Sequence, residues 1–294
     1  MGIEHDDKAL SSFIENYQLN GYVVLSGLLA GSLLDQLNQL TEDLLTRAGA
    51  ISAEDAIYDL EPGHTAQQPA VRRIKKPHDI DALYRSAAAD KVLLPYLKAV
   101  IGHDIRLHHS KINTKQPLTG SSLEWHQDWA FIPHTNQSVV VASLMLDDVD
   151  ATNGPMLVIP GSHRKTLLDH RNSAGEFTGA IDPDDPELST EEAVAVTGPA
   201  GTVTLHHPLL IHGAGPNRSE RRRNVLFYEY AAADAWPLFY GVNWPEYSSR
   251  LICGKECIEP RLEPCFVRMG YPRPYEGSIY ANQQAARKRF FTDR

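Results

Sequence analysis

The sequence predicts an α+β fold, mainly β, in which N-terminal helices pack on a β-sandwich or rolled double sheet. Helical patterns dominate residues 1–103, whereas β-type runs separated by turn residues dominate residues 104–235. Because helices come first and strands second, this order favours α+β. The chain has no repeats and no low-complexity linker. We therefore expect one domain over residues 1–294, with residues 236–294 as a C-terminal extension.

The helical half is read from apolar spacing. Ala9, Leu10, Phe13 and Tyr17 recur at helical intervals, and Gly21 follows as a stop signal. The expected elements of this half are a helix over 6–21, a strand over 22–29, a helix over 30–49, a loop over 51–71 and a helix over 80–102 that Pro95 breaks into two pieces.

The second half is read from β-branched and aromatic runs bounded by turn signals such as "TNGP" and "IPGSH". The expected strands lie within residues 105–115, 123–131, 138–149, 156–160, 192–198, 202–207 and 223–232.

Composition limits the partners of this 294-residue chain. Its 28 basic and 37 acidic residues give a formal charge of −9, which argues against nucleic acid or an anionic membrane surface as the main partner. No apolar run approaches the length of a membrane span, and the acidic start lacks the core of a signal peptide. Only three cysteines occur, which favours a reducing, cytoplasmic location. The oligomeric state is left open.

The stretch "LEWHQDWAF" contains the first candidate metal ligands. In a strand, His126 and Asp128 would point to the same face, because side chains alternate. The simpler interpretation is that the two side chains hydrogen-bond to each other, and the functional interpretation is that they bind the same metal ion. The downstream segment "TLHHPLLIHGAG" offers His206, His207 and His212 as partners. Two imidazoles and one carboxylate leave three open positions, as in non-haem Fe(II) oxygenases, whereas a structural zinc site would close with four protein ligands.

The residues after His212 favour this histidine over the other two. Three arginines follow it by nine to eleven positions, beyond the turn-like "GAGPNRS". A dianionic cosubstrate such as 2-oxoglutarate needs a planar, two-pronged cation for its far carboxylate, which a guanidinium provides. A returning strand would bring one of these arginines back beside the metal, with Arg221 and Arg223 on one face and Arg222 on the opposite face.

Four motifs together resemble the phytanoyl-CoA dioxygenase family of Fe(II)/2-oxoglutarate oxygenases. They are "SKINTKQP", "WHQDWAF", "DATNGPMLVIPGSHR" and "HGAGPNRSERRR", in the order and spacing of that family. The resemblance implies a double-stranded β-helix (jelly roll, cupin-like) core with packed N-terminal helices. It also implies Fe(II), 2-oxoglutarate and O₂ as cofactor and cosubstrates. The implied metal ligands are His126, Asp128 and His212.

The resemblance further implies that Arg223 binds the far carboxylate of 2-oxoglutarate and that Asn113 is an additional cosubstrate contact. Members of the family often have a serine two residues after the distal histidine, where this chain has Ala214. Thr204 and Ser219 are the candidates to supply the missing hydrogen bond.

The expected reaction is hydroxylation of an unactivated C–H bond in a small or medium metabolite, with release of succinate and CO₂. Two alternatives are a metal-dependent hydrolase or isomerase on a cupin-like barrel and a non-catalytic metabolite-binding relative. Arg223 argues against the first, since water activation needs no such cation. All three ligands are retained, which argues against the second.

Substrate contacts are less well marked. Arg73 lies in the basic run "RRIKKPH", which is either a solvated loop or a rim that attracts an anion. Trp129 and His108 are further candidates from the strands. Residues 176–192 carry seven acidic residues and no lysine or arginine, and they read as a solvated loop or, alternatively, as a lid over the pocket.

Overall fold

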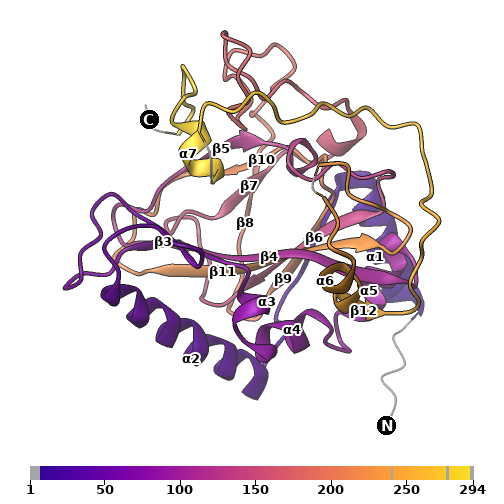
Figure 1. Cartoon of the computed structure of the whole chain (residues 1–294), viewed down its shortest axis with the longest axis horizontal. Helices are drawn as coiled ribbons and strands as arrows, with labels where there is room; N and C mark the ends of the chain where they lie inside the picture. The colour runs from indigo at the N-terminus through magenta and orange to yellow at the C-terminus, as the bar shows by residue number, and fades with distance from the viewer. Residues whose placement is uncertain (1–6, 240, 276–277, 292–294) are drawn as a thin grey trace.

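The computed structural model describes residues 7–239, 241–275 and 278–291. Within these residues the chain forms two facing antiparallel sheets, with helices on the outer face of the larger sheet (Figure 1). The larger sheet has the order β1-β9-β6-β11-β4-β3-β2, with β12 paired to β4, and the smaller has the order β5-β10-β7-β8. This arrangement is the rolled double sheet that the sequence predicts.

The strands of the larger sheet are β1 (Tyr22–Leu25), β2 (Tyr58–Leu60), β3 (Val71–Lys75), β4 (Ile105–Lys115), β6 (Val139–Met145), β9 (Val203–His206), β11 (Arg223–Ala232) and β12 (Leu251–Cys253). Those of the smaller sheet are β5 (Leu123–His126), β7 (Met156–Val158), β8 (Val194–Val196) and β10 (His212–Ala214).

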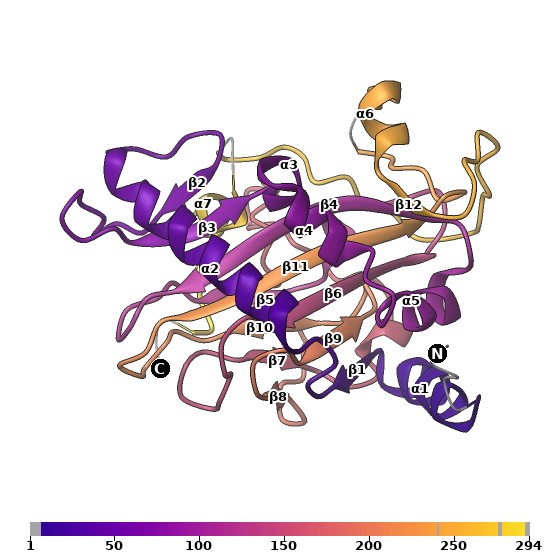
Figure 2. The same ribbon diagram turned by 90° about the horizontal axis from the view of Figure 1, so that it is seen from below.

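Helix α2 (Ser32–Arg47) runs across the outer face of the larger sheet (Figure 2). Its leucines Leu37 and Leu44 are buried in the same hydrophobic cluster as Ile112 of β4 and Leu226 of β11. Burying such a side chain contributes about 1.5–3 kcal/mol. The remaining helical segments are α1 (Asp7–Asn20), α3 (Pro77–Ile80), α4 (Ala82–Ala88), α5 (Leu94–Ile101), α6 (Trp244–Ser249) and α7 (Ile279–Gln283), with 3₁₀ turns η1 (Ala48–Ala50), η2 (Asp128–Ala130) and η3 (Ser162–Arg164).

The expectation of a helix in two pieces over 80–102 is confirmed, because α4 and α5 are separate and Pro95 occupies the first turn of α5. This position suits proline, whose missing N–H has no helical acceptor there. In the described residues, no helix combines the length and apolar character needed to cross a membrane.

Two expectations for residues 51–78 are wrong. Residues 51–71 were expected to form a loop but contain β2 and the start of β3, and the basic run 72–78 is not a solvated loop. Arg73 and Lys75 of β3 both pair with the buried Asp59 of β2, at 2.5 and 3.1 Å. Strand β3 can carry these charges because Asp59 of the neighbouring strand neutralises them. Its sequence therefore lacks the apolar pattern by which a strand is recognised.

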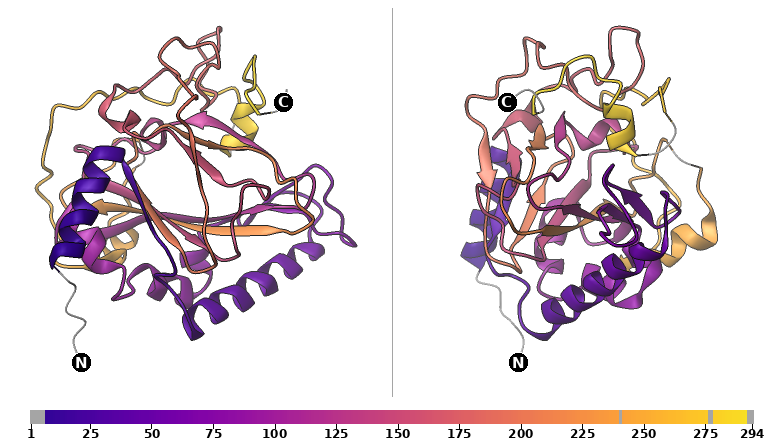
Figure 3. Two further views of the ribbon diagram at one scale, coloured as in Figure 1. Left: turned by 180° about the vertical axis from the view of Figure 1, so that it is seen from behind. Right: turned by 90° about the vertical axis from the view of Figure 1, so that its left-hand side faces the viewer.

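The C-terminal part of the chain returns to the side of the molecule where the smaller sheet lies (Figure 1). After β12, residues 254–275 pass along the molecule in an extended path, and α7 ends beside the smaller sheet (Figures 1 and 3). One face of β4 is directed toward the smaller sheet. Every second residue of the strand lies on this face, namely His109, Lys111, Asn113 and Lys115.

Candidate active site

Neighbouring strands of the smaller sheet bring the predicted metal ligands together. His126 ends β5 and His212 begins β10, and the two are paired residues in the antiparallel register. The strand expected over 123–131 ends at His126, so Asp128 begins the turn η2 instead of continuing the strand. One oxygen or nitrogen donor from each of these three buried side chains lies within 4.8 Å of the other two.

Backbone hydrogen bonds fix the orientation of both imidazoles. The Nδ1 atom of His126 lies 2.8 Å from the Glu124 carbonyl oxygen, and that of His212 lies 2.9 Å from the Leu210 carbonyl oxygen. Because a carbonyl only accepts, the proton of each neutral ring is on Nδ1. The Nε2 lone pairs are therefore free to bind a metal, which is the usual arrangement of metal-binding histidines.

The protonation states also suit a divalent cation. Burial lowers the pKa of His212 well below its usual range, so the ring is neutral at physiological pH. Burial alone would raise the pKa of Asp128, but the surrounding histidines outweigh it and hold this pKa well below the usual range. Two neutral imidazoles and one carboxylate fit Fe(II), and this donor set leaves coordination positions for other ligands.

A narrow cavity of about 50 Å³ extends from the ligands between the two sheets. Arg223 and Lys115, which are paired residues of β11 and β4, line it together with Asn113. Arg223 is buried and donates to the carbonyl oxygens of Asn153 and Gly154. Burial lowers its pKa to about 10, so the guanidinium stays charged at neutral pH.

Lys115 lies beside Arg223, and among the residues that the structure describes it forms no ion pair with a carboxylate. Its ammonium donates to the Ser121 and Gly215 carbonyl oxygens, at 2.7 and 2.6 Å. Burial and then the charge of Arg223 lower the pKa of Lys115 well below its usual range. Gly154 makes room for this side chain, since a Cβ there would lie 2.7 Å from Lys115 Cδ. Two neighbouring basic groups in the wall of a cavity provide a site for an anion.

Two of the expected cosubstrate contacts lie elsewhere. Thr204 is fully buried on β9 but does not line this narrow cavity, whereas its register partner Ser143 does. Ser219 lies in the turn before β11, where its hydroxyl contacts Asn217 and Arg221. Of the three arginines, Arg221 and Arg222 pair with Asp150 and Glu42 at the surface, and Arg223 points inward as predicted.

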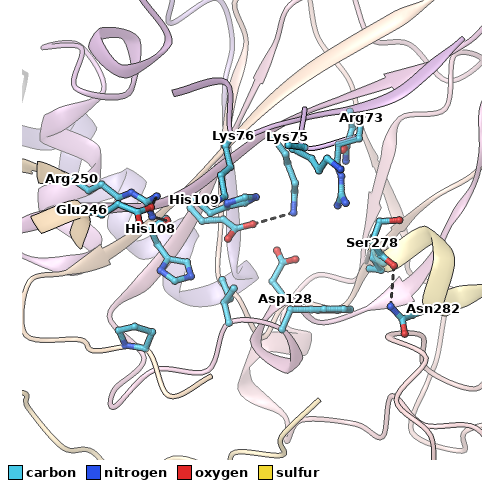
Figure 4. Close-up of a pocket in the computed structure, with 18 of the residues that line it drawn as sticks. Arg73, Lys75, Lys76, His108, His109, Asp128, Glu246, Arg250, Ser278 and Asn282 are labelled. Carbon is cyan, nitrogen blue, oxygen red and sulfur yellow. Dashed lines mark hydrogen bonds and ion pairs between the residues drawn. The ribbon is translucent and has the colours of Figure 1, made fainter. Parts of the chain in front are cut away.

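A larger cavity of about 520 Å³ opens from Asp128 toward the solvent (Figure 4). Its lining includes two of the three expected substrate residues, Arg73 and His108. The third, Trp129, is fully buried in a hydrophobic cluster and donates to the Phe266 carbonyl oxygen. The turn η2 directs this indole into the core, so the structure does not bring Trp129 to the cavity.

Residues 176–192 also stay away from both cavities. Phe177 to Ile181 are largely buried, and the Ile181 amide donates to the Trp125 carbonyl oxygen. This first part of the acidic segment is therefore packed against β5 rather than solvated.

Sequence reasoning missed a charged pair on the cavity wall. Lys111 and Glu229 face the cavity from β4 and β11, and their charged atoms lie 3.0 Å apart. Alternation with Asn113 could have indicated Lys111 and Lys115, because all three share one face of a strand. A single carboxylate in the apolar run "VLFYEYAA" was the signal for Glu229, since buried acids are rarely without a partner.

Comparisons with known proteins agree with this geometry. Residues 17–225 match the phytanoyl-CoA dioxygenase (PhyH) family. The chain is 35% identical over 283 residues to a probable alpha-ketoglutarate-dependent hypophosphite dioxygenase of Stutzerimonas stutzeri, covering 94% of this chain and 97% of that protein. It is 27% identical over 252 residues to an ectoine dioxygenase of Bordetella bronchiseptica, covering 78% of each.

Solved structures show the same fold. The EctD protein from S. alaskensis, crystallised with bound Fe, superimposes with a TM-score of 0.66 at 23% identity, covering 90% of this chain and 89% of that one. The same protein with 2-oxoglutarate and 5-hydroxyectoine gives a TM-score of 0.66 at 24% identity, with 92% and 91% covered. The expected jelly-roll core is confirmed.

The relatives also favour the oxygenase among the functional alternatives, because curated proteins similar to this chain are named as dioxygenases and hydroxylases. The chain belongs to the phytanoyl-CoA dioxygenase family, and it is an Fe(II)- and 2-oxoglutarate-dependent dioxygenase.

Proposed function

We propose that His126, Asp128 and His212 bind Fe(II) and that the narrow cavity binds 2-oxoglutarate. Arg223 binds the far carboxylate of 2-oxoglutarate with Lys115 beside it, and Asn113 contacts the part nearer the metal. Support comes from the buried basic pair, Arg223 and Lys115, that lines this cavity. Support also comes from the Oδ1 atom of Asn113, which is buried and accepts no hydrogen bond within the described part of the chain.

We infer further that the substrate is a small anion. The larger cavity is lined by six basic side chains and three acidic ones, and adding Asp59 and Asp79, which pair with lining arginines, leaves 6 − 5 = +1 before a metal binds. The basic residues are Arg73, Lys75, Lys76, Lys111, Arg250 and Arg273, and the acidic lining residues are Asp128, Glu229 and Glu246. Such a wall attracts anions and repels cations.

The first substrate to test is hypophosphite, the substrate named for the relative from Stutzerimonas stutzeri. Two features support it together: the similarity extends over nearly the full length of both proteins, and Lys111 lines the cavity that also contains Asp128. Hypophosphite is a monoanion with two P–H bonds. Its oxidation would insert one oxygen atom into a P–H bond and give phosphite, with succinate and CO₂ from the cosubstrate.

The bound iron and cosubstrate supply the activation of O₂, and the chain supplies position and environment. Lys111 contacts the substrate anion and orients its P–H bond toward the metal ligands, while Glu229 holds the Lys111 ammonium in place. Burial lowers the pKa of His109 to about 3 and that of His108 to about 4, so both rings are neutral at physiological pH. They can hydrogen-bond an oxyanion without adding charge.

A second candidate is the C–H hydroxylation expected from the sequence, with a larger anionic metabolite as substrate. It is favoured by the cavity of about 520 Å³, which is much larger than an ion of three heavy atoms and extends to Glu246 and Arg250.

We also propose that the chain forms a single catalytic domain, because the C-terminal residues Ser278 and Asn282 line this cavity. The three free cysteines support a reducing, cytoplasmic location.

The test has two stages. Apoprotein is first titrated anaerobically with Fe(II) and 2-oxoglutarate, and we expect a visible charge-transfer band that needs both components. Aerobic turnover is then followed by succinate release with hypophosphite and with small carboxylates and phosphonates, and phosphite is detected by ³¹P NMR. Succinate coupled to phosphite supports the first candidate, whereas succinate coupled only to a larger anion supports the second. Absence of the band in folded protein would overturn the metal and cosubstrate assignment.

A further inference from the structure

His206 contacts the proposed metal centre without belonging to the ligand set. It is the last residue of β9, is fully buried, and its Nε2 atom lies 3.0 Å from Asp128 Oδ2. The Nε2 atoms of His126 and His212 are each 3.7 Å from an Asp128 oxygen, beyond hydrogen-bond range. His206 is thus the histidine of the three that hydrogen-bonds this carboxylate.

The hydrogen-bonding pattern of His206 is the reverse of that of the two ligand histidines. In His126 and His212, Nδ1 donates to a backbone carbonyl and Nε2 is left free. In His206, Nδ1 is buried and has no hydrogen-bond partner among the described residues, and Nε2 meets the carboxylate. Since an ionised carboxylate only accepts, the proton of this ring is on Nε2, and this nitrogen has no lone pair for a metal.

We propose that His206 is a positioning residue that makes Asp128 bind Fe(II) through a single oxygen. This inference rests on the metal assignment proposed above. The hydrogen bond from His206 occupies Oδ2 and leaves Oδ1 for the metal. A carboxylate free of that bond can turn to bind through both oxygens, as carboxylates do at other metal sites. The second oxygen would then take a coordination position that 2-oxoglutarate or O₂ needs.

The alternative role of His206 is packing alone, since its ring also lies 4.9 Å from the ring of His212. Two substitutions separate these roles. His206→Phe keeps an aromatic ring of similar size but removes the donor. His206→Gln has a smaller, non-aromatic side chain but places an amide N–H donor near the position of Nε2. Packing and hydrogen bonding therefore predict opposite rankings of the two variants.

His207→Phe is the matched control. His207 is the next residue of the chain, and its ring faces away from the metal ligands toward His163 and Tyr17. Its Nδ1 atom accepts the Leu209 amide instead of meeting a metal ligand. A loss seen with His206→Phe but not with His207→Phe cannot come from a general disturbance of β9.

The measurement is anaerobic binding of Fe(II), followed by 2-oxoglutarate, to the full-length wild-type and variant proteins, read from the charge-transfer band. We expect His206→Phe to weaken Fe(II) or 2-oxoglutarate binding by about 10-fold or more and to shift the band, because partners of metal ligands typically contribute 10–100-fold. His206→Gln should restore most of the affinity and the band position. Wild-type affinity and band position in His206→Phe, or equal losses in both variants with equal thermal destabilisation, would overturn the inference. Failure of the wild-type protein to give the band would instead reject the metal assignment.

Discussion

Lys111 Nζ lies 3.0 Å from Glu229 Oε1, and both side chains line the cavity that contains Asp128. The pair crosses two central strands of the larger sheet, β4 and β11. Glu229 is buried, and the charge of Lys111 contributes to the lowered pKa of its carboxyl group, which burial alone would raise. The lysine therefore has two separable effects: it stabilises a buried carboxylate, and it offers an ammonium to the substrate.

We expect Lys111→Met to raise the KM for an anionic substrate by about tenfold or more, since hydrogen bonds to charged groups contribute about 1.5–3 kcal/mol. The same change leaves Glu229 buried without its partner, which typically lowers the free energy of unfolding by about 3–5 kcal/mol. Steady-state kinetics and urea denaturation measure the two effects.

The double variant Lys111→Met/Glu229→Gln separates them. We expect it to recover most of the stability, because no buried charge is left unpaired, and to keep the high KM. Recovery of the wild-type KM together with stability would show that Lys111 acts through the fold and not on the substrate.

Asp128→Ala and His212→Ala should each abolish iron-dependent succinate release while the circular dichroism spectrum stays unchanged. Each removes one of the three donors that converge within 4.8 Å. Asp169→Ala is the control, because this aspartate is exposed and pairs with Arg171 and Arg268 away from the site. Wild-type activity in either ligand variant would remove that residue from the metal site.

Two of the three ligands were accessible to sequence reasoning through local spacing, whereas His212, which meets His126 by the pairing of β10 with β5, was identified from the residues that follow it and from the family resemblance. His126 and Asp128 are two residues apart, so they share a side even though the strand ends between them and η2 begins. Alternation set Arg222 apart from Arg221 and Arg223, and the family resemblance then identified Arg223, which is the first residue of β11.

The cavity wall was not accessible, because it depends on register between distant strands. The sequence of β3 resembles a polar loop, because it gives no sign that Asp59 of β2 neutralises Arg73 and Lys75 in the folded protein. Lys111 and Glu229 meet only because β4 and β11 pair in one particular register. Trp129 was misplaced for the opposite reason: a local change from strand to 3₁₀ turn redirected a side chain that strand alternation could not follow.

Arg223→Ala should mainly raise the KM for 2-oxoglutarate, by about tenfold or more, since a hydrogen-bonded charge contributes about 1.5–3 kcal/mol and 1.4 kcal/mol is tenfold. Arg223→Lys should recover part of the loss, because it keeps the charge but not the planar fork. The neighbouring Arg222→Ala is the matched control, as Arg222 pairs with Glu42 at the surface. An unchanged KM in Arg223→Ala would move the role to Lys115.

Protein stability should fall as the pH is lowered below 6.5, and His134 allows a clean test. This buried ring donates from Nδ1 to the Ile132 carbonyl oxygen, and burial followed by nearby His108 lowers its pKa to about 3. The native state thus binds fewer protons than the unfolded state, in which the pKa is near 6.5. Its stabilising contribution is complete above pH 6.5 and is lost as the pH falls toward 3.

We expect wild-type protein to lose about 2 kcal/mol more unfolding free energy between pH 7 and pH 5 than His134→Asn, since one pKa unit corresponds to about 1.4 kcal/mol. The asparagine amide can still donate to the Ile132 carbonyl oxygen but does not titrate. Urea denaturation with a metal chelator present measures the difference. The exposed His103→Asn should behave like the wild type. Equal pH dependence in wild type and His134→Asn would mean that the His134 ring becomes protonated in the folded protein as readily as in the unfolded chain.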